Sequence, residues 1–67
     1  MYGKIKGYRN MLNLTQTELG KELGLTKQSY SNKERGKREF TDKEKKKMKD
    51  LLLPIFPDVT IDDIFFW

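Results

Sequence analysis

Residues 14–38 constrain what this chain can fold into more than any other stretch, because helix-start and helix-stop signals alternate there at short spacing. Thr15 and Glu18 form a Thr-x-x-Glu capping box, in which each side chain accepts a hydrogen bond from the other residue's backbone amide. This box predicts a helix over residues 16–23. Gly24 is expected to end that helix, since a glycine just past a helix takes the left-handed conformation without penalty.

A second helix is predicted over residues 27–35, with Thr26 as its N-cap and Gly36 as its end. Tyr30 faces inward, and the other faces carry polar side chains. Gln and Asn can contact adenine bidentately, whereas Lys and Arg can reach guanine or phosphate. Such a pair of helices is typical of a DNA-reading helix-turn-helix, here residues 15–35, although its polarity would also suit a solvated face. The polar residues are Lys27, Gln28, Ser31, Asn32 and Arg35.

At these residues the sequence resembles the Cro/CI-type helix-turn-helix regulators of phages and bacteria. The matching features cover residues 5–38 at consistent spacing, and a fainter likeness continues to residue 65. The resemblance implies an all-α, five-helix domain of the lambda-repressor type. The residues that carry it are Arg9, Leu14-Thr15-Gln16, Leu19, Gly24, Tyr30-Ser31-Asn32 and Glu34-Arg35-Gly36-Lys37-Arg38.

The resemblance also implies roles for single residues. Arg9 would pair with Glu34 to tie the first helix to the recognition helix, and Gln16 would brace a phosphate and position a neighbouring side chain. Gly20 stands where the family usually has alanine, which costs about 1 kcal/mol of helix propensity. Lys33 stands where the family buries an apolar residue, so we expect its stem on the core and its ammonium group in water or on a phosphate. The major groove would be met by Thr26, Lys27, Gln28, Ser31 and Asn32.

The net charge of +4 is unevenly distributed along the chain. Residues 1–49 hold all fourteen Lys and Arg and six acids, which gives 14 − 6 = +8, whereas residues 50–67 hold four Asp and no base, which gives −4. A polyanion is therefore expected to meet the first part of the chain. Lys37 and Arg38 are predicted to hold DNA phosphates, which gives affinity without sequence information. The lysine run over residues 43–49 is interpreted as a solvated face, with direct DNA contact as the alternative.

Helices are also expected on both sides of this stretch. The first should run to about Leu12, with apolar residues at helical spacing. The fourth should begin near Asp42 after a Thr41 capping box and end before Pro54. Thr60 should cap a short last helix, whose adjacent acids suit a helix N-terminus better than a metal site.

Length and composition exclude several functional classes. Sixty-seven residues predict one domain over 1–67, and the absence of cysteine and histidine removes disulfides, thiol catalysis and imidazole zinc sites. No nucleophile–base pair is evident, so we expect neither an enzyme nor a cofactor. No stretch is long and apolar enough for a membrane, and we expect a cytoplasmic protein of a bacterial host cell.

The C-terminal segment, residues 56–67, is predicted to form an association surface. It is rich in aromatic residues and has no basic residue, and its apolar side chains outnumber those that one short helix can turn inward. The alternative is that these residues cap the core of the monomer. The association residues are Phe56, Ile64, Phe65, Phe66 and Trp67.

These expectations combine into one functional hypothesis and one rival. The hypothesis is a sequence-specific transcriptional regulator, a Cro-like repressor of a phage or mobile-element switch, which binds double-stranded operator DNA as a homodimer. The rival is an antirepressor, in which the same scaffold forms a complex with another repressor protein through the apolar tail or the recognition surface.

Overall fold

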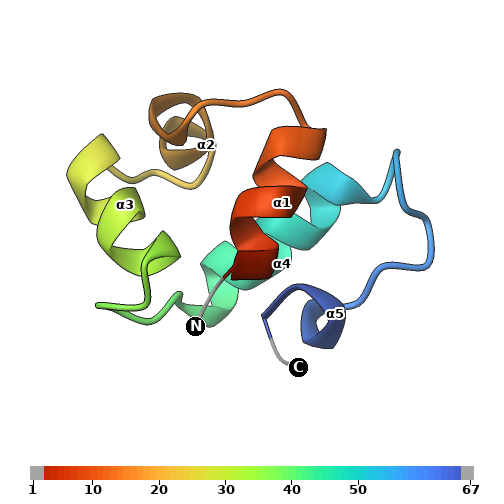
Figure 1. Cartoon of the computed structure of the whole chain (residues 1–67). Coiled ribbons are helices and arrows are strands. Elements are labelled where there is room, and N and C mark those ends of the chain that lie inside the picture. Colours follow the sequence, from red (N-terminus) through yellow and green to blue (C-terminus); the bar gives the residue numbers. More distant parts are fainter. Residues whose placement is uncertain (1–2, 66–67) are drawn as a thin grey trace.

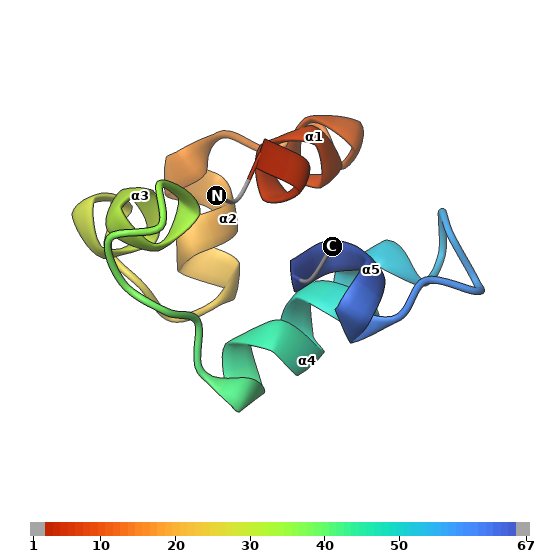
Figure 2. The ribbon, with the colours of Figure 1, turned by 60° about the horizontal axis from the view of Figure 1, so that its bottom comes forward.

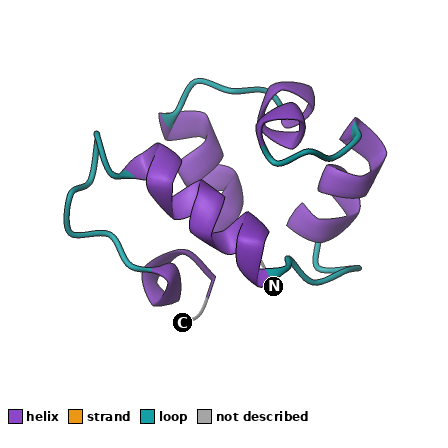
Figure 3. Cartoon of the chain, turned by 180° about the vertical axis from the view of Figure 1, so that it is seen from behind, coloured by secondary structure: helices purple, strands orange, loops and turns teal. Residues whose placement is uncertain are grey.

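Five helices in chain order make up the structure, a computed structural model that describes residues 3–65. Within these residues the backbone consists of helices and loops, as Figure 3 shows, so the predicted all-α, five-helix fold is confirmed. Figure 1 shows their arrangement in space. The helices are α1 (Gly3–Met11), α2 (Gln16–Glu22), α3 (Lys27–Glu34), α4 (Asp42–Leu52) and α5 (Ile61–Phe65).

Capping interactions set the helix starts where the sequence predicts them. Thr15 Oγ1 accepts from the Glu18 amide at 3.1 Å, and Glu18 Oε1 accepts from the Thr15 amide at 2.8 Å. Thr41 begins α4 with the same reciprocal pair, and Thr60 begins α5 with Asp63 as its partner. Each threonine thereby satisfies a backbone amide that the first turn of a helix leaves without an intrahelical acceptor.

Left-handed residues end the first three helices. Asn13 follows α1 with φ of 59°, Gly24 follows α2 with φ of 76°, and Gly36 follows α3 with φ of 84°. The predicted stops at Gly24 and Gly36 are thus confirmed. The turn at Gly24 joins α2 to α3, and these two helices pack against each other as a helix-turn-helix.

The hydrophobic core joins two groups of helices, α1 to α3 on one side and α4 with α5 on the other, as Figure 2 shows. A row of aromatic rings crosses between them. The Tyr30 and Phe40 ring centroids lie 6.1 Å apart, and those of Phe40 and Phe65 lie 5.2 Å apart. Phe40 thereby fixes the loop after α3 to the core. The buried apolar residues are Ile5, Leu19, Tyr30, Phe40, Met48, Leu52, Val59, Ile64 and Phe65.

The close packing of α2 against α3 explains why position 20 holds a glycine. It is buried where α3 crosses α2, and a Cβ atom there would lie 3.1 Å from the Cβ of Tyr30 and 3.2 Å from the carbonyl oxygen of Leu25. Both distances are shorter than ordinary van der Waals contact. The propensity cost therefore accompanies a close approach of the two helices of the helix-turn-helix.

Candidate nucleic-acid interface

The outward face of α3 carries polar side chains, while its inward face is fixed in the core. Tyr30 and Glu34 are buried. At 100° per residue, Gln28, Asn32 and Arg35 lie on the opposite side of the helix. Gln28 and Arg35 are exposed and Asn32 is half-buried. Gln28 Nε2 donates to Asn32 Oδ1 at 3.2 Å, so these two amide side chains are held next to each other on the surface.

Three further predicted contact residues lie at the start of α3 or beside this face. Thr26 and Lys27 are exposed at the start of α3, and Ser31 is half-buried one turn later. Thr26 Oγ1 accepts from the Ser29 amide at 3.1 Å, so this hydroxyl also caps the helix. The structure thus places the predicted base-contacting residues on α3 and its N-cap, with no large apolar side chain on the face of Gln28 and Asn32.

Behind this face, Glu34 accepts hydrogen bonds from three side chains, one on each of α1, α2 and α3. Arg9 Nε donates to Glu34 Oε2 at 2.8 Å, Tyr30 Oη donates to the same oxygen at 2.7 Å, and Gln16 Nε2 donates to Oε1 at 3.0 Å. Arg9 Nη1 also donates to the carbonyl oxygen of Leu14 at 3.0 Å. The ion pair expected between Arg9 and Glu34 is therefore present, and it is the centre of a larger polar cluster. We call Arg9, Gln16, Tyr30 and Glu34 the Glu34 cluster.

The Glu34 cluster is ionised and fully hydrogen-bonded. Burial acts to raise the pKa of Glu34, but the hydrogen bonds from Arg9, Tyr30 and Gln16 together hold that pKa below its ordinary value. The hydrogen bond to Glu34 raises the pKa of Arg9, and burial raises the pKa of Tyr30. Among the described residues, every buried side-chain nitrogen and oxygen has a hydrogen-bond partner. The cluster therefore holds α3 at a fixed rotation against α1 and α2.

Gln16 contacts a neighbouring side chain, as the resemblance implies, and that side chain is Glu34. Its amide group donates to Glu34 from the first turn of α2, and the residue is half-buried. The proposed phosphate contact would have to use the remaining polar atoms of this amide.

Lys33 differs from its predicted placement, in which the ammonium group lies in water or on a phosphate. Its Nζ lies 2.6 Å from Glu44 Oε1, and the two side chains are only 14% and 11% exposed. Glu44 also caps α4 by accepting from the Thr41 amide, so its carboxylate is fixed beside α3. Burial acts to raise the pKa of Glu44, and the bond from Lys33 helps to lower it below its ordinary value. The ammonium group of Lys33 is thus held by the carboxylate of Glu44 and does not extend into water.

The basic loop after α3 is folded back on that helix. The backbone amides of Lys37 and Arg38 lie 2.8 Å and 3.3 Å from the carbonyl oxygen of Asn32, and both residues are exposed. Lys43, Lys46 and Lys47 are exposed on α4. Exposed basic side chains therefore lie next to the end of α3. If α3 entered a groove, the phosphate backbone would lie near these side chains.

The predicted association surface is wrong for two of its residues. Ile64 and Phe65 are 1% and 8% exposed, because the short α5 turns them against α1 and α4. Phe56 is half-buried and packs edge-on against Tyr8, with ring centroids 6.1 Å apart. Phe66 and Trp67 lie outside the described residues.

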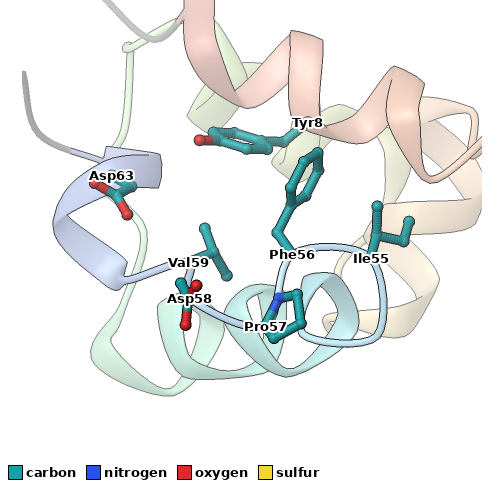
Figure 4. A pocket seen from close by; sticks show the side chains of 7 residues that line it. All are labelled: Tyr8, Ile55, Phe56, Pro57, Asp58, Val59 and Asp63. Carbon is teal, nitrogen blue, oxygen red and sulfur yellow. The ribbon is translucent and has the colours of Figure 1, made fainter.

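The exposed apolar surface lies beside Tyr8 and Phe56, and of its residues only Phe56 was among the predicted association residues. Figure 4 shows these two rings side by side above the turn at Pro57 and Asp58. The large apolar residues that are most exposed in the described chain are Met11 and Ile55, at 54% and 47%. Met11 is the last residue of α1, and Ile55 follows Pro54 just beyond α4, and no local pattern in the sequence indicated that these apolar side chains face outward.

Residues 3–65 contain neither a cluster of acidic side chains that could hold a metal ion nor a helix that could cross a membrane. A family model described as helix-turn-helix matches residues 5–49, which is more than half of the chain. No curated protein and no solved structure shows significant similarity to this chain. The matched region runs from Ile5 in α1 to Lys49 in α4 and so includes the Glu34 cluster and the whole outward face of α3.

Proposed function

Because this chain belongs to the Cro/CI-type helix-turn-helix family of DNA-binding regulators, we propose that it reads a specific double-stranded operator with α3. One observation carries the proposal. The face of α3 that points away from Tyr30 presents hydrogen-bonding side chains, and the Glu34 cluster fixes that face from behind. A fixed helix with polar side chains is what direct readout in the major groove requires.

Gln28 and Asn32 are the proposed base readers. Both are amides, which suit bidentate contact with adenine, and each already holds the other at 3.2 Å on the surface. Lys27 and Arg35 lie to either side along the helix and can reach guanine or phosphate. Thr26 and Ser31 complete the proposed contact set as smaller hydroxyl groups.

Lys37, Arg38 and Gln16 are the proposed phosphate contacts. The first two are exposed in a loop whose backbone is hydrogen-bonded to the end of α3, so their charges move with the recognition helix. Gln16 stands in the first turn of α2, where backbone amides favour an anion. These contacts would position α3 without reading sequence.

The finer proposal is a homodimeric repressor of a phage or mobile-element switch. One recognition helix reads only a few base pairs, and two-fold pairing doubles the contact on a palindromic operator. The net charge of +4 favours association with DNA for both the monomer and the dimer.

Selection from a random duplex library, followed by binding titrations on the selected and on scrambled DNA, tests the proposal. Asn32→Ala is expected to weaken the selected site by about 1–3 kcal/mol and to relax specificity at one position, with little change on scrambled DNA. Lys37→Ala is expected to weaken both DNAs alike and to lower the salt slope by about one unit.

Equal losses on selected and scrambled DNA for Asn32→Ala would remove it from the base readers. Failure to bind any duplex, together with capture of a repressor protein encoded next to this chain, would favour the antirepressor instead.

A further inference from the structure

The rings of Tyr8 and Phe56 line two hollows, each with a volume of about 300 Å³. The two ring planes meet at 83°, with their centroids 6.1 Å apart, so a right-angled aromatic corner lies on either side of the contact. The first hollow also borders Asp63 and residues 57–59 of the loop after α4. The second hollow borders α1 and Phe56 alone.

The two hollows differ in charge. The carboxylates of Asp58 and Asp63 line the first hollow, and none of the described basic residues does. Lys4 lines the second hollow, and none of the described acidic residues does. The first hollow thus lies in the acidic end of the chain, residues 50–67, which holds four Asp and no base. Salt screens the distant lysines, since charges farther apart than about 10 Å interact weakly at 0.1 M ionic strength.

The carboxylate of Asp58 is available to a ligand. This side chain is exposed and forms no hydrogen bond or ion pair with another residue of the described range 3–65. Asp63 is partly used, because its Oδ2 accepts from the Thr60 amide at 3.0 Å and so caps α5. Asp63 is therefore held in place at the rim, whereas Asp58 carries the negative charge that no described residue pairs with.

We propose that the first hollow binds a small organic cation that carries a quaternary ammonium group. The face of an aromatic ring attracts a cation, and a corner of two rings offers two such faces, as in the aromatic cages that bind choline-like groups. A quaternary ammonium group has no N–H that needs an acceptor, so it loses little against apolar walls such as Val59 and Pro57. Asp58 supplies the opposite charge at the rim.

The size of the hollow favours a small molecule over a peptide. Figure 4 shows Tyr8, Phe56, Val59 and Asp63 arranged around one space. A volume of about 300 Å³ is at the lower end of the range for ligand pockets, which suits a molecule of the size of choline.

The site is separate from the proposed DNA interface. Figures 1 and 3 place α3 and the loop after α4 at opposite ends of the molecule. Tyr8 belongs to α1, whereas the other walls belong to the loop after α4 and to α5. A bound cation would therefore join the two groups of helices and stabilise the folded chain by mass action.

Titration of the ¹⁵N-labelled full chain with choline, followed by amide NMR shifts, is the primary test. We expect saturable shifts at residues 55–59 and at Asp63, with a dissociation constant of about 1 mM, because cation–π contacts at exposed sites are weak. The uncharged isostere 3,3-dimethylbutan-1-ol, in which carbon replaces the ammonium nitrogen, should bind at least about fivefold more weakly.

Three substitutions separate the ring faces from the charge. Phe56→Leu keeps an apolar side chain but removes one ring, so it should raise the dissociation constant about two- to fivefold. Tyr8→Phe keeps its ring and should bind choline like the wild type. Asp58→Asn should raise the dissociation constant about two- to fivefold, the range expected of an exposed ion pair.

Asp62→Asn is the matched control for Asp58→Asn, because it removes the same charge from an exposed residue of α5 outside the hollow. It is expected to bind choline like the wild type. Circular dichroism establishes that each variant is folded.

The absence of saturable shifts with choline would overturn the proposal, as would equal binding of the uncharged isostere or equal effects of Asp58→Asn and Asp62→Asn. Shifts confined to Gly7 and Met11 would place the ligand in the second hollow and contradict the argument from charge. A trimethyllysine peptide that binds more tightly than choline would overturn the choice of a small molecule. The titration contains no DNA, so its outcome is independent of the proposed function.

Discussion

The two sides of α3 are attached to the rest of the molecule in different ways. Towards α1 and α2, Glu34 accepts hydrogen bonds from Arg9, Gln16 and Tyr30. Towards α4, Lys33 makes one ion pair with Glu44, beside the packing of Phe40 on Tyr30. Lys33 and Glu34 are adjacent in sequence, and the 100° step of a helix directs them to different neighbours.

This difference separates two structural tasks. The Glu34 cluster joins three helices through one carboxylate, so it sets the rotation of α3 and therefore which side chains face outward. The Lys33–Glu44 pair joins only two side chains, and Glu44 would still cap α4 without Lys33. We therefore expect the first attachment to be worth more to the fold than the second.

Glu34→Ala is expected to have the largest effect. It leaves the buried Arg9 guanidinium unpaired and removes the acceptor for Tyr30 and Gln16, so the free energy of unfolding should fall by about 3–5 kcal/mol. Urea denaturation measures this change. Glu39→Ala is the control, because Glu39 is exposed, and it should stay within about 0.5 kcal/mol of the wild type. Equal effects of the two variants would show that the cluster does not stabilise the fold.

Acidification is expected to have the next largest effect, because a neutral Glu34 can still accept hydrogen bonds from Tyr30 and Gln16. The folded pKa of Glu34 and of Glu44 lies below the ordinary value of 4.5. Their contribution to stability is therefore fully present above pH 4.5 and is lost as the pH falls through the folded pKa values. The melting temperature, measured at decreasing pH from pH 7, should fall below pH 4.5. The fall should be smaller for Glu34→Gln than for the wild type. An identical decline in both proteins would contradict the assignment.

Lys33→Met tests the weaker attachment. It keeps most of the apolar stem and removes the ammonium group, which leaves Glu44 partly buried but still bonded to the Thr41 amide. The free energy of unfolding should fall by about 1–3 kcal/mol, less than for Glu34→Ala. Adding Glu44→Gln to Lys33→Met should recover part of the loss, since no unpaired charge remains. A loss larger than that of Glu34→Ala would reverse the comparison.

The smallest expected effect is that of Lys33→Met on DNA binding. Because Lys33 Nζ is held by Glu44, it should not contact phosphate, and the salt slope of binding should stay within experimental error of the wild type. Lys37→Ala is the matched comparison, with a slope lower by about one unit. A lower slope for folded Lys33→Met protein would mean that Lys33 leaves Glu44 when DNA binds.

Much of the helix-turn-helix was predictable because its signals are local. The capping boxes at Thr15 and Thr41 join residues three apart, and the glycines that end α2 and α3 act within one turn. The Arg9–Glu34 pair spans 25 residues, and only the resemblance to a family indicated it. The partner of Lys33 lies 11 residues away on another helix, and neither local pattern nor resemblance pointed to Glu44.

The sequence by itself determined where α2, α3 and α4 begin and where α2 and α3 end, because capping hydrogen bonds and left-handed turns depend on residues within about four positions of each other. Only the tertiary structure decided which apolar side chains are enclosed. Ile64 and Phe65 are buried because α5 returns to α1 and α4, whereas Met11 and Ile55 stay exposed because no described segment packs over them. Periodicity specifies the faces of one helix, and burial depends on how several helices meet.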